Sequence, residues 1–192
     1  MYRTSEEYDR MAMLAISILV DYGIKDFPLD MDYLCKRMNI NLIPYSAYDG
    51  REQALLALSK DGFNTKKIAG NNATIFFNDK YGNVTPERIS QTKGHELKHI
   101  LEDDSDDSED DLSDYFGKYL RCPIPLLIYL NIEGTLDIMS RFGTSSEQTQ
   151  YIIKGLKNRK RKYGNAIFSY EVELLESVLG NKLDLSDITI ID

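Results

Sequence analysis

Apolar residues recur at steps of three and four along most of the chain, which is the spacing of one buried helix face. The first such run follows a capping box formed by Thr4 and Glu7, and Gly23 comes directly after it. Thr85 followed by Pro86 gives a second helix start of familiar type. The helices expected from these patterns cover residues 4–22, 30–38, 51–58 and 86–101, then a segment that begins within 102–114 and ends at Pro123, and finally 126–130, 136–142, 146–162 and 170–179.

Short runs of apolar and β-branched residues between these helices predict strands. Residues 40–45 are typical of an extended segment, and residues 73–77 are the most strand-like part of the chain. Glycine and asparagine separate further short extended pieces between residues 61 and 83. We therefore expect an α+β protein that is mostly helical, with a small, about three-stranded antiparallel sheet packed on the helix over residues 86–101.

The length of 192 residues, of which 42% are hydrophobic, is enough for an ordinary domain with a substantial core. Pro123 and Pro125 end a helix, and the most plausible division of the chain follows at residues 132–135. We therefore predict a first domain over residues 1–131 and a helical region over residues 132–192.

Charge and cysteine content narrow the classes of partner. The net charge of -8 argues against a protein that coats nucleic acid through its overall field. No apolar run approaches the roughly 20 residues that cross a bilayer, and the most apolar stretch, residues 11–20, lacks a basic leader. Cys35 and Cys122 lie far apart and in unlike contexts, as expected of buried thiols in a reducing compartment. These features favour a cytoplasmic protein with no membrane partner.

The segment His95-Glu96-Leu97-Lys98-His99 contains both histidines of the chain. Histidines four residues apart on a helix project from one face, so their imidazoles can bind one metal ion. Glu96 is offset by about 100° and can reach a water on that ion without being a ligand. Such a metal acidifies the water and polarises a carbonyl, while Glu96 moves the proton. We therefore predict a Zn²⁺ site for peptide hydrolysis, with Glu96 as general base.

A catalytic zinc site needs a third protein ligand and leaves one position for water. The acidic tract over residues 102–114 follows the histidines directly. A ligand should come from the ordered helix that faces the histidines rather than from the connecting loop. This leaves Glu109, Asp110 and Asp111 as candidates. The remaining carboxylates are expected to form a solvated acidic segment that leads into the helix.

Several of these features occur in the order found in the ImmA/IrrE family of metallopeptidases. The strand over residues 75–79 precedes a helix with the metal motif, and the helix over residues 110–120 follows and ends in Cys122-Pro123. This last block is similar to the family's signature of an acidic residue, alanine, Asn or Asp, Phe-Ala, Leu-Leu and proline. The resemblance covers most of the chain and implies a zincin-like fold for the first domain.

The resemblance also implies roles for single residues. Asp110 stands where the family has its third zinc ligand, and Asp114 stands where an Asn or Asp supports the site. The family more often has Glu as this ligand, and Asp is one methylene shorter, so the second helix must approach closely or Glu109 or Asp111 must replace Asp110. Ser113 and Gly117 take the places of alanines and suit close helix packing. Lys98 takes the place of a glycine, which we expect an exposed position to tolerate.

The function implied by the resemblance is cleavage of a repressor or another DNA-binding regulator of a phage or mobile element, with a consequent change in transcription. The alternative is a non-hydrolytic, peptidase-like regulator that binds a repressor or DNA. Residues 136–142 and the helix from Ser146 have the spacing of a helix-turn-helix, and basic residues follow on that helix. Direct nucleic-acid binding through them is the less favoured interpretation, because positive charge is common near helix C-termini.

Overall fold

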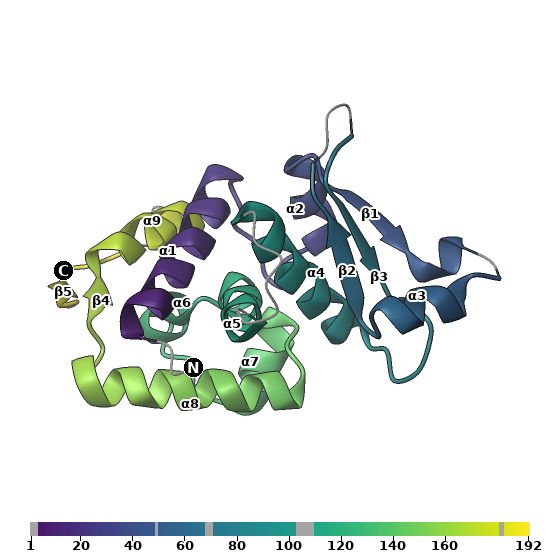
Figure 1. Ribbon diagram of the computed structural model, residues 1–192. Coiled ribbons are helices and arrows are strands. Elements are labelled where there is room, and N and C mark those ends of the chain that lie inside the picture. The colour runs from purple at the N-terminus through teal and green to yellow at the C-terminus, as the bar shows by residue number, and fades with distance from the viewer. Residues whose placement is uncertain (1–3, 49, 68–70, 103–109, 181–182) are drawn as a thin grey trace. The chain divides into compact units, whose positions relative to one another are not determined.

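The structure is a computed structural model and describes residues 4–48, 50–67, 71–102, 110–180 and 183–192. Figure 1 shows a mostly helical chain in which strands form only a small part. The elements are α1 (Ser5–Asp21), α2 (Met31–Arg37), β1 (Asn41–Pro44), η1 (Tyr45–Ala47), α3 (Glu52–Leu58), β2 (Gly62–Thr65), β3 (Thr74–Phe77), α4 (Pro86–Leu101), α5 (Asp110–Arg121), α6 (Ile124–Tyr129), α7 (Thr135–Phe142), α8 (Ser146–Tyr163), β4 (Ile167–Phe168), η3 (Ser169–Glu171), α9 (Val172–Leu179) and β5 (Ile190–Ile191). The expected α+β composition is confirmed.

The chain forms two compact units. One comprises residues 30–117 and contains the sheet, and the other combines residues 1–29 with residues 118–192. The predicted division at residues 131 and 132 does not coincide with these units. Leu126 and Leu127 of α6 share one apolar core with Ile138 of α7 and Ile152 of α8, so the chain on both sides of residue 131 belongs to the same unit.

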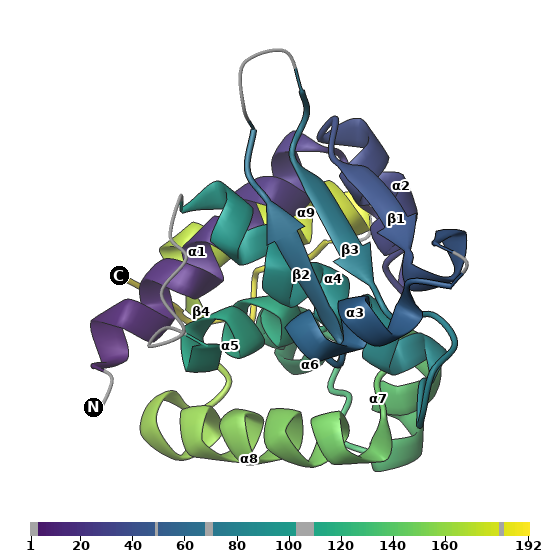
Figure 2. The same cartoon turned by 45° about the vertical axis from the view of Figure 1, so that its right-hand side comes forward.

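The sheet of the first unit has the strand order β1-β3-β2, which Figure 2 shows with β3 in the middle. β2 pairs antiparallel with β3, whereas β1 pairs parallel with it. The prediction of an antiparallel sheet was therefore wrong for β1. An antiparallel pair can be joined by a tight turn, but a parallel pair needs a crossover, and here α3 and β2 intervene between β1 and β3.

Helix α4 packs against β2 and β3. It starts as expected, because the Thr85 hydroxyl accepts a hydrogen bond from the Arg88 N–H and Pro86 occupies the first turn. Lys93 on this helix is buried, lies 4.0 Å above the centre of the Phe77 ring and pairs with Asp32 of α2. The helix is thereby fixed to the sheet on one side and to α2 on the other.

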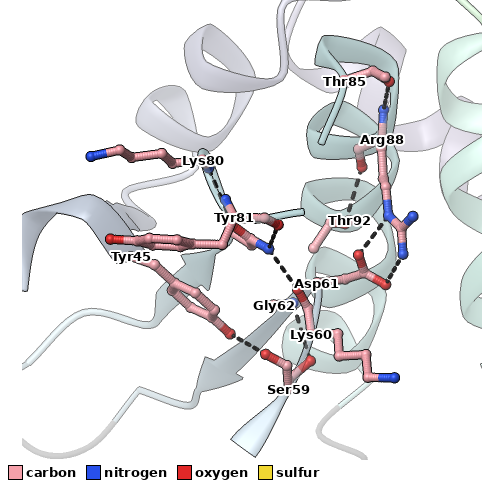
Figure 3. Close-up of polar contacts among 11 residues, drawn as sticks. Tyr45, Ser59, Lys60, Asp61, Gly62, Lys80, Tyr81, Thr85, Arg88 and Thr92 are labelled. Atoms are coloured by element: carbon pink, nitrogen blue, oxygen red, sulfur yellow. Dashed lines mark hydrogen bonds and ion pairs between the residues drawn. The ribbon is translucent and has the colours of Figure 1, made fainter. Parts of the chain in front are cut away.

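A bidentate ion pair connects the residue before β2 to the first half of α4. Arg88 donates from Nε and Nη2 to the two carboxylate oxygens of Asp61, at 2.6 and 2.9 Å. Figure 3 shows this pair beside Thr92, whose hydroxyl donates to the Arg88 carbonyl. On the other side of β2, the Tyr45 hydroxyl donates to the Ser59 carbonyl. The position of β2 along α4 is thus held by side chains at the strand's beginning.

The second unit is built from α1 and α6 to α9, together with the last residues of α5. A fully buried carboxylate, Glu171, joins its parts, because it pairs with Arg159 of α8 and accepts hydrogen bonds from the Tyr119 hydroxyl and the Phe168 N–H. α1 packs against α9. A two-stranded parallel pair, β4 with β5, was not predicted, because two residues per strand give no readable pattern.

The expectation about the two cysteines has a direct counterpart in the structure. Cys35 and Cys122 are both buried free thiols, as predicted. Burial raises the pKa of Cys35 to about 12 and also raises the pKa of Cys122. In the part of the chain that the structure describes, no helix is both long and apolar enough to span a bilayer.

Candidate metal centre

The two histidines of the motif meet on one face of α4. Their Nε2 atoms lie 3.2 Å apart, and the ring centres are 5.0 Å apart. His99 is buried and His95 is partly buried. One helical turn separates the two residues, so the capped, uninterrupted helix is sufficient to bring the two nitrogens together.

Asp110 joins the histidines from the first residue of α5. Its Oδ1 atom lies 3.6 Å from His95 Nε2 and 3.7 Å from His99 Nε2. Bonds of about 2.0–2.2 Å around a tetrahedral zinc ion would place neighbouring ligand atoms about 3.3–3.6 Å apart. All three observed separations fall close to that range. The donor set of two imidazoles and one carboxylate therefore fits a zinc ion in both chemistry and spacing.

The other candidates for third ligand are placed differently or not described. Asp111 accepts a hydrogen bond from the Leu112 N–H, which is a helix-start contact. Glu109 lies outside the described residues, as do the acidic residues from 103 to 108. Among the residues that are described, the group able to hold a metal consists of His95, His99 and Asp110. Of the two candidates that are described, Asp110 is the one that lies beside the histidines, and it is also the residue implied by the family resemblance.

Asp114, one turn after Asp110, contacts the opposite nitrogen of His95. The His95 Nδ1 atom lies 3.0 Å from Asp114 Oδ1. Since a carboxylate can only accept, Nδ1 carries the proton and Nε2 keeps its lone pair for the metal position. Burial lowers the pKa of His95, but the hydrogen bond to Asp114 and the charges of Glu96, Asp114 and Asp110 outweigh it, and the pKa is raised overall. Asp114 therefore orients the imidazole of His95.

The Glu96 side chain contacts β2 of the sheet. Its carboxylate accepts a hydrogen bond of 2.7 Å from the Asn64 side-chain amide, and the residue is 8% exposed. Asn64 pairs with Ile75 across the β2–β3 ladder, and its hydrogen bond to Glu96 shows that its side chain lies on the α4 side of the sheet. Sequence reasoning missed Asn64, because nothing in a short polar strand marks one asparagine as the partner of a residue 32 positions later.

Ser113 is a second residue whose part in the site was not foreseen. Its hydroxyl lies 3.1 Å from His99 Nε2, and its side chain is fully buried. The sequence suggested only that a small residue was needed there for helix packing. The structure places a hydroxyl group next to one of the nitrogens that would bind the metal.

Lys98, between the two histidines, was expected to be exposed, and this was wrong. Its side chain is fully buried, and its ammonium group lies 3.2 Å from the Glu102 carboxylate one turn later. A buried ammonium needs a compensating charge, and the (i, i+4) spacing supplies one from the same helix. Lysine is therefore accommodated by pairing rather than by solvent.

The basic run on α8 is partly used within the second unit. Arg159 is paired with Glu171, and Lys160 is paired with Glu133. Lys154, Lys157 and Arg161 are exposed. Two of the cations that suggested a phosphate-binding helix thus already have carboxylate partners in their own unit.

Comparison of the chain with known protein families, curated proteins and solved structures gave no match. The resemblance to ImmA/IrrE metallopeptidases therefore rests on the motif residues alone. What the site can do chemically follows from its own geometry.

Proposed function

We propose that this chain is a zinc-dependent endopeptidase that acts on a protein, with His95, His99 and Asp110 as metal ligands and Glu96 as general base. The observation that carries the proposal is the meeting of three ligand atoms from two helices, 3.2–3.7 Å apart. The proposal also draws on the similarity of the motif and its flanking residues to the ImmA/IrrE family.

The number of ligands favours catalysis over a purely structural role. Catalytic zinc sites use three protein ligands and keep one position for water, whereas structural sites use four. Within the described residues the group has three members. Other divalent ions accept the same donor set, and zinc is proposed because two imidazoles with one carboxylate are a common zinc environment.

A zinc ion held there would acidify a bound water and polarise the carbonyl of a peptide bond. Glu96 accepts the proton of that water and passes it to the leaving amine. Asn64 holds the Glu96 carboxylate in place during both transfers. Asp114 keeps the His95 ring in the tautomer and orientation that present Nε2 to the metal.

An extended polypeptide fits the surroundings of Glu96. Within the described residues β2 is an edge strand, and Asn64 on it contacts Glu96. An edge strand can bind an extended backbone through main-chain hydrogen bonds. A peptide added to β2 would lie beside the general base. By resemblance, we propose that the natural substrate is a repressor or another DNA-binding regulator.

The test combines cleavage with metal analysis. Zinc-loaded protein is incubated with a proteome-derived mixture of peptides and native proteins, and new N-termini are identified by mass spectrometry. We expect cleavage by the unaltered chain and a loss of at least about 100-fold in Glu96→Gln, with zinc content unchanged. Glu147→Gln, an exposed carboxylate in α8, is the matched control and should cleave normally.

His95→Ala and His99→Ala are each expected to abolish stoichiometric zinc in chelator-washed protein. Full zinc retention in either variant would remove the site from consideration. Undiminished cleavage by Glu96→Gln would refute the assigned base. Zinc binding with no cleavage of any component would instead favour the non-hydrolytic regulator.

A further inference from the structure

Helices α4 and α5 of the first unit cross with their backbones close together, and the Gln91 side-chain amide of α4 also lies next to the crossing. The crossing point is formed by Gly94 and Gly117. A Cβ atom added to Gly94 would lie 3.0 Å from the Gly117 Cα. A Cβ added to Gly117 would lie 3.2 Å from both the Gly94 carbonyl carbon and the His95 nitrogen. The two backbones are therefore too close to accept an ordinary side chain at either glycine without a shift.

This crossing is adjacent to a proposed ligand on α4 and lies on the same helix as the proposed ligand of α5. Gly94 immediately precedes His95, and Gly117 lies about two turns beyond Asp110 on α5, at about 1.5 Å of rise per residue. Asp110 has the shorter of the two acidic side chains, yet its Oδ1 atom comes within 3.6 and 3.7 Å of the two histidine nitrogens. A short carboxylate reaches the site because its helix is close.

We propose that the Gly94–Gly117 crossing determines how close the carboxylate of residue 110 comes to the two histidine nitrogens. Gly117 is then a positioning residue for the metal site. A larger residue at position 117 would require a longer carboxylate side chain at position 110. This inference rests on the metal site of the proposed function. It does not require that the chain cleave peptides.

The backbone shift expected from a substitution at Gly117 is large enough to change the zinc affinity. Relief of the 3.2 Å contacts to ordinary van der Waals separation, 3.4–4 Å, moves the α5 backbone away by a few tenths of an ångström. Metal–ligand distances tolerate only about 0.2 Å. Replacing aspartate with glutamate adds one carbon–carbon bond, about 1.5 Å. Gly117→Ala should therefore withdraw Asp110 from the metal, and Asp110→Glu in the same chain should restore contact.

The experiment measures Zn²⁺ affinity by competition with a chromogenic chelator, and Co²⁺ coordination by visible absorption. We expect Gly117→Ala to lose about 10- to 100-fold in affinity and to show an altered Co²⁺ spectrum. The double variant Gly117→Ala with Asp110→Glu should recover most of the loss. Gly155→Ala in α8 is the control, because nothing lies within 4 Å of its added Cβ, and its affinity should be unchanged.

Wild-type affinity in a folded Gly117→Ala variant, or a double variant no better than the single one, would overturn the inference. If Gly117→Ala does not fold, the single variant Asp110→Glu still tests the inference, because this substitution leaves the Gly94–Gly117 crossing intact. We expect its longer side chain to bind zinc more weakly than Asp110, and equal or tighter binding would contradict the inference. Failure of the unaltered chain to bind zinc would instead refute the metal site itself.

Discussion

Two carboxylates near the histidines, Glu96 and Asp110, have opposite surroundings. Glu96 is 8% exposed and bound to the Asn64 amide, whereas the side chain of Asp110 is 59% exposed and lies 3.6 Å from His95 Nε2. A general base must keep one orientation while it exchanges protons, and a ligand needs its lone pairs directed at the ion. The different surroundings of the two carboxylates therefore agree with the two different roles proposed for them.

Asn64 provides a test of this distinction. Asn64→Ala removes the hydrogen bond to Glu96 without touching a ligand. We expect kcat for a peptide found in the cleavage screen to fall by about 10- to 100-fold because the base is less well positioned, while KM and zinc content change little. Asn41→Ala is the matched control, since Asn41 donates to Thr74 from β1, at the opposite edge of the same sheet from Asn64. A normal kcat in Asn64→Ala would show that Glu96 is positioned without it.

The predictable part of the site is the part within one helix. The spacing of His95 and His99 on α4 is dictated by helix geometry, so a continuous helix was enough to predict that their nitrogens meet. The sequence could narrow the proposed third ligand only to Glu109, Asp110 or Asp111, because the choice depends on how closely α5 approaches α4. Asn64 could not be found, since its contact with Glu96 depends on strand register and on packing of the sheet against α4.

At the scale of elements, the ion pair between Arg159 of α8 and Glu171 of η3 holds the second unit together. Glu171 is fully buried, and the Tyr119 hydroxyl of α5 donates to the same carboxylate. Removing the cation would leave a buried charge without its main partner. Such an arrangement stabilises its surroundings only as long as it is complete.

We expect Arg159→Met to lower the free energy of unfolding by about 3–5 kcal/mol, measured by urea denaturation. Adding Glu171→Leu to the same chain should recover much of the loss, because the uncompensated charge is gone. Lys154→Met, an exposed residue of α8, is the control and should stay within about 0.5 kcal/mol of the unaltered chain. A small loss in Arg159→Met would mean that the hydrogen bonds from Tyr119 and Phe168 suffice for Glu171.

Helices were easier to predict than strand pairing for a physical reason. The caps at Thr4, Asp30, Thr85 and Ser145 bond to N–H groups two or three residues later, so the signal and the structure lie in the same few residues. The parallel pairing of β1 with β3 instead depends on the course of the chain through α3 and β2, which lie between the two strands in sequence. The residues of β1 and β3 contain no local pattern that predicts this course.

At the scale of the whole molecule, the two units do not follow the chain from end to end. Residues 1–29 belong with residues 118–192 because α1 packs against α9. The sequence could show that α1 has an apolar face, but not which distant helix covers it. The candidate metal centre, in contrast, lies wholly within residues 30–117.

This separation predicts a local response to metal. Zinc at 100 times its Kd stabilises the folded site by about 2.7 kcal/mol, and openings that release the ion become about 100-fold rarer. Because the second unit has its own core, its openings need not release zinc. Hydrogen exchange should therefore slow in α4 and β2 when zinc is added, while α9 keeps its rate.

The matched control is His99→Ala, in which zinc should leave exchange unchanged everywhere. Equal slowing in α4 and α9 would show that the units open together, and the candidate site would then be coupled to the fold of the entire chain. Slowing confined to α9 would place zinc elsewhere, since that helix contributes none of the ligands. Slowing of α4 and β2 alone in the unaltered chain is the outcome that the three-ligand site requires, because those elements carry His95, His99 and the partner of Glu96.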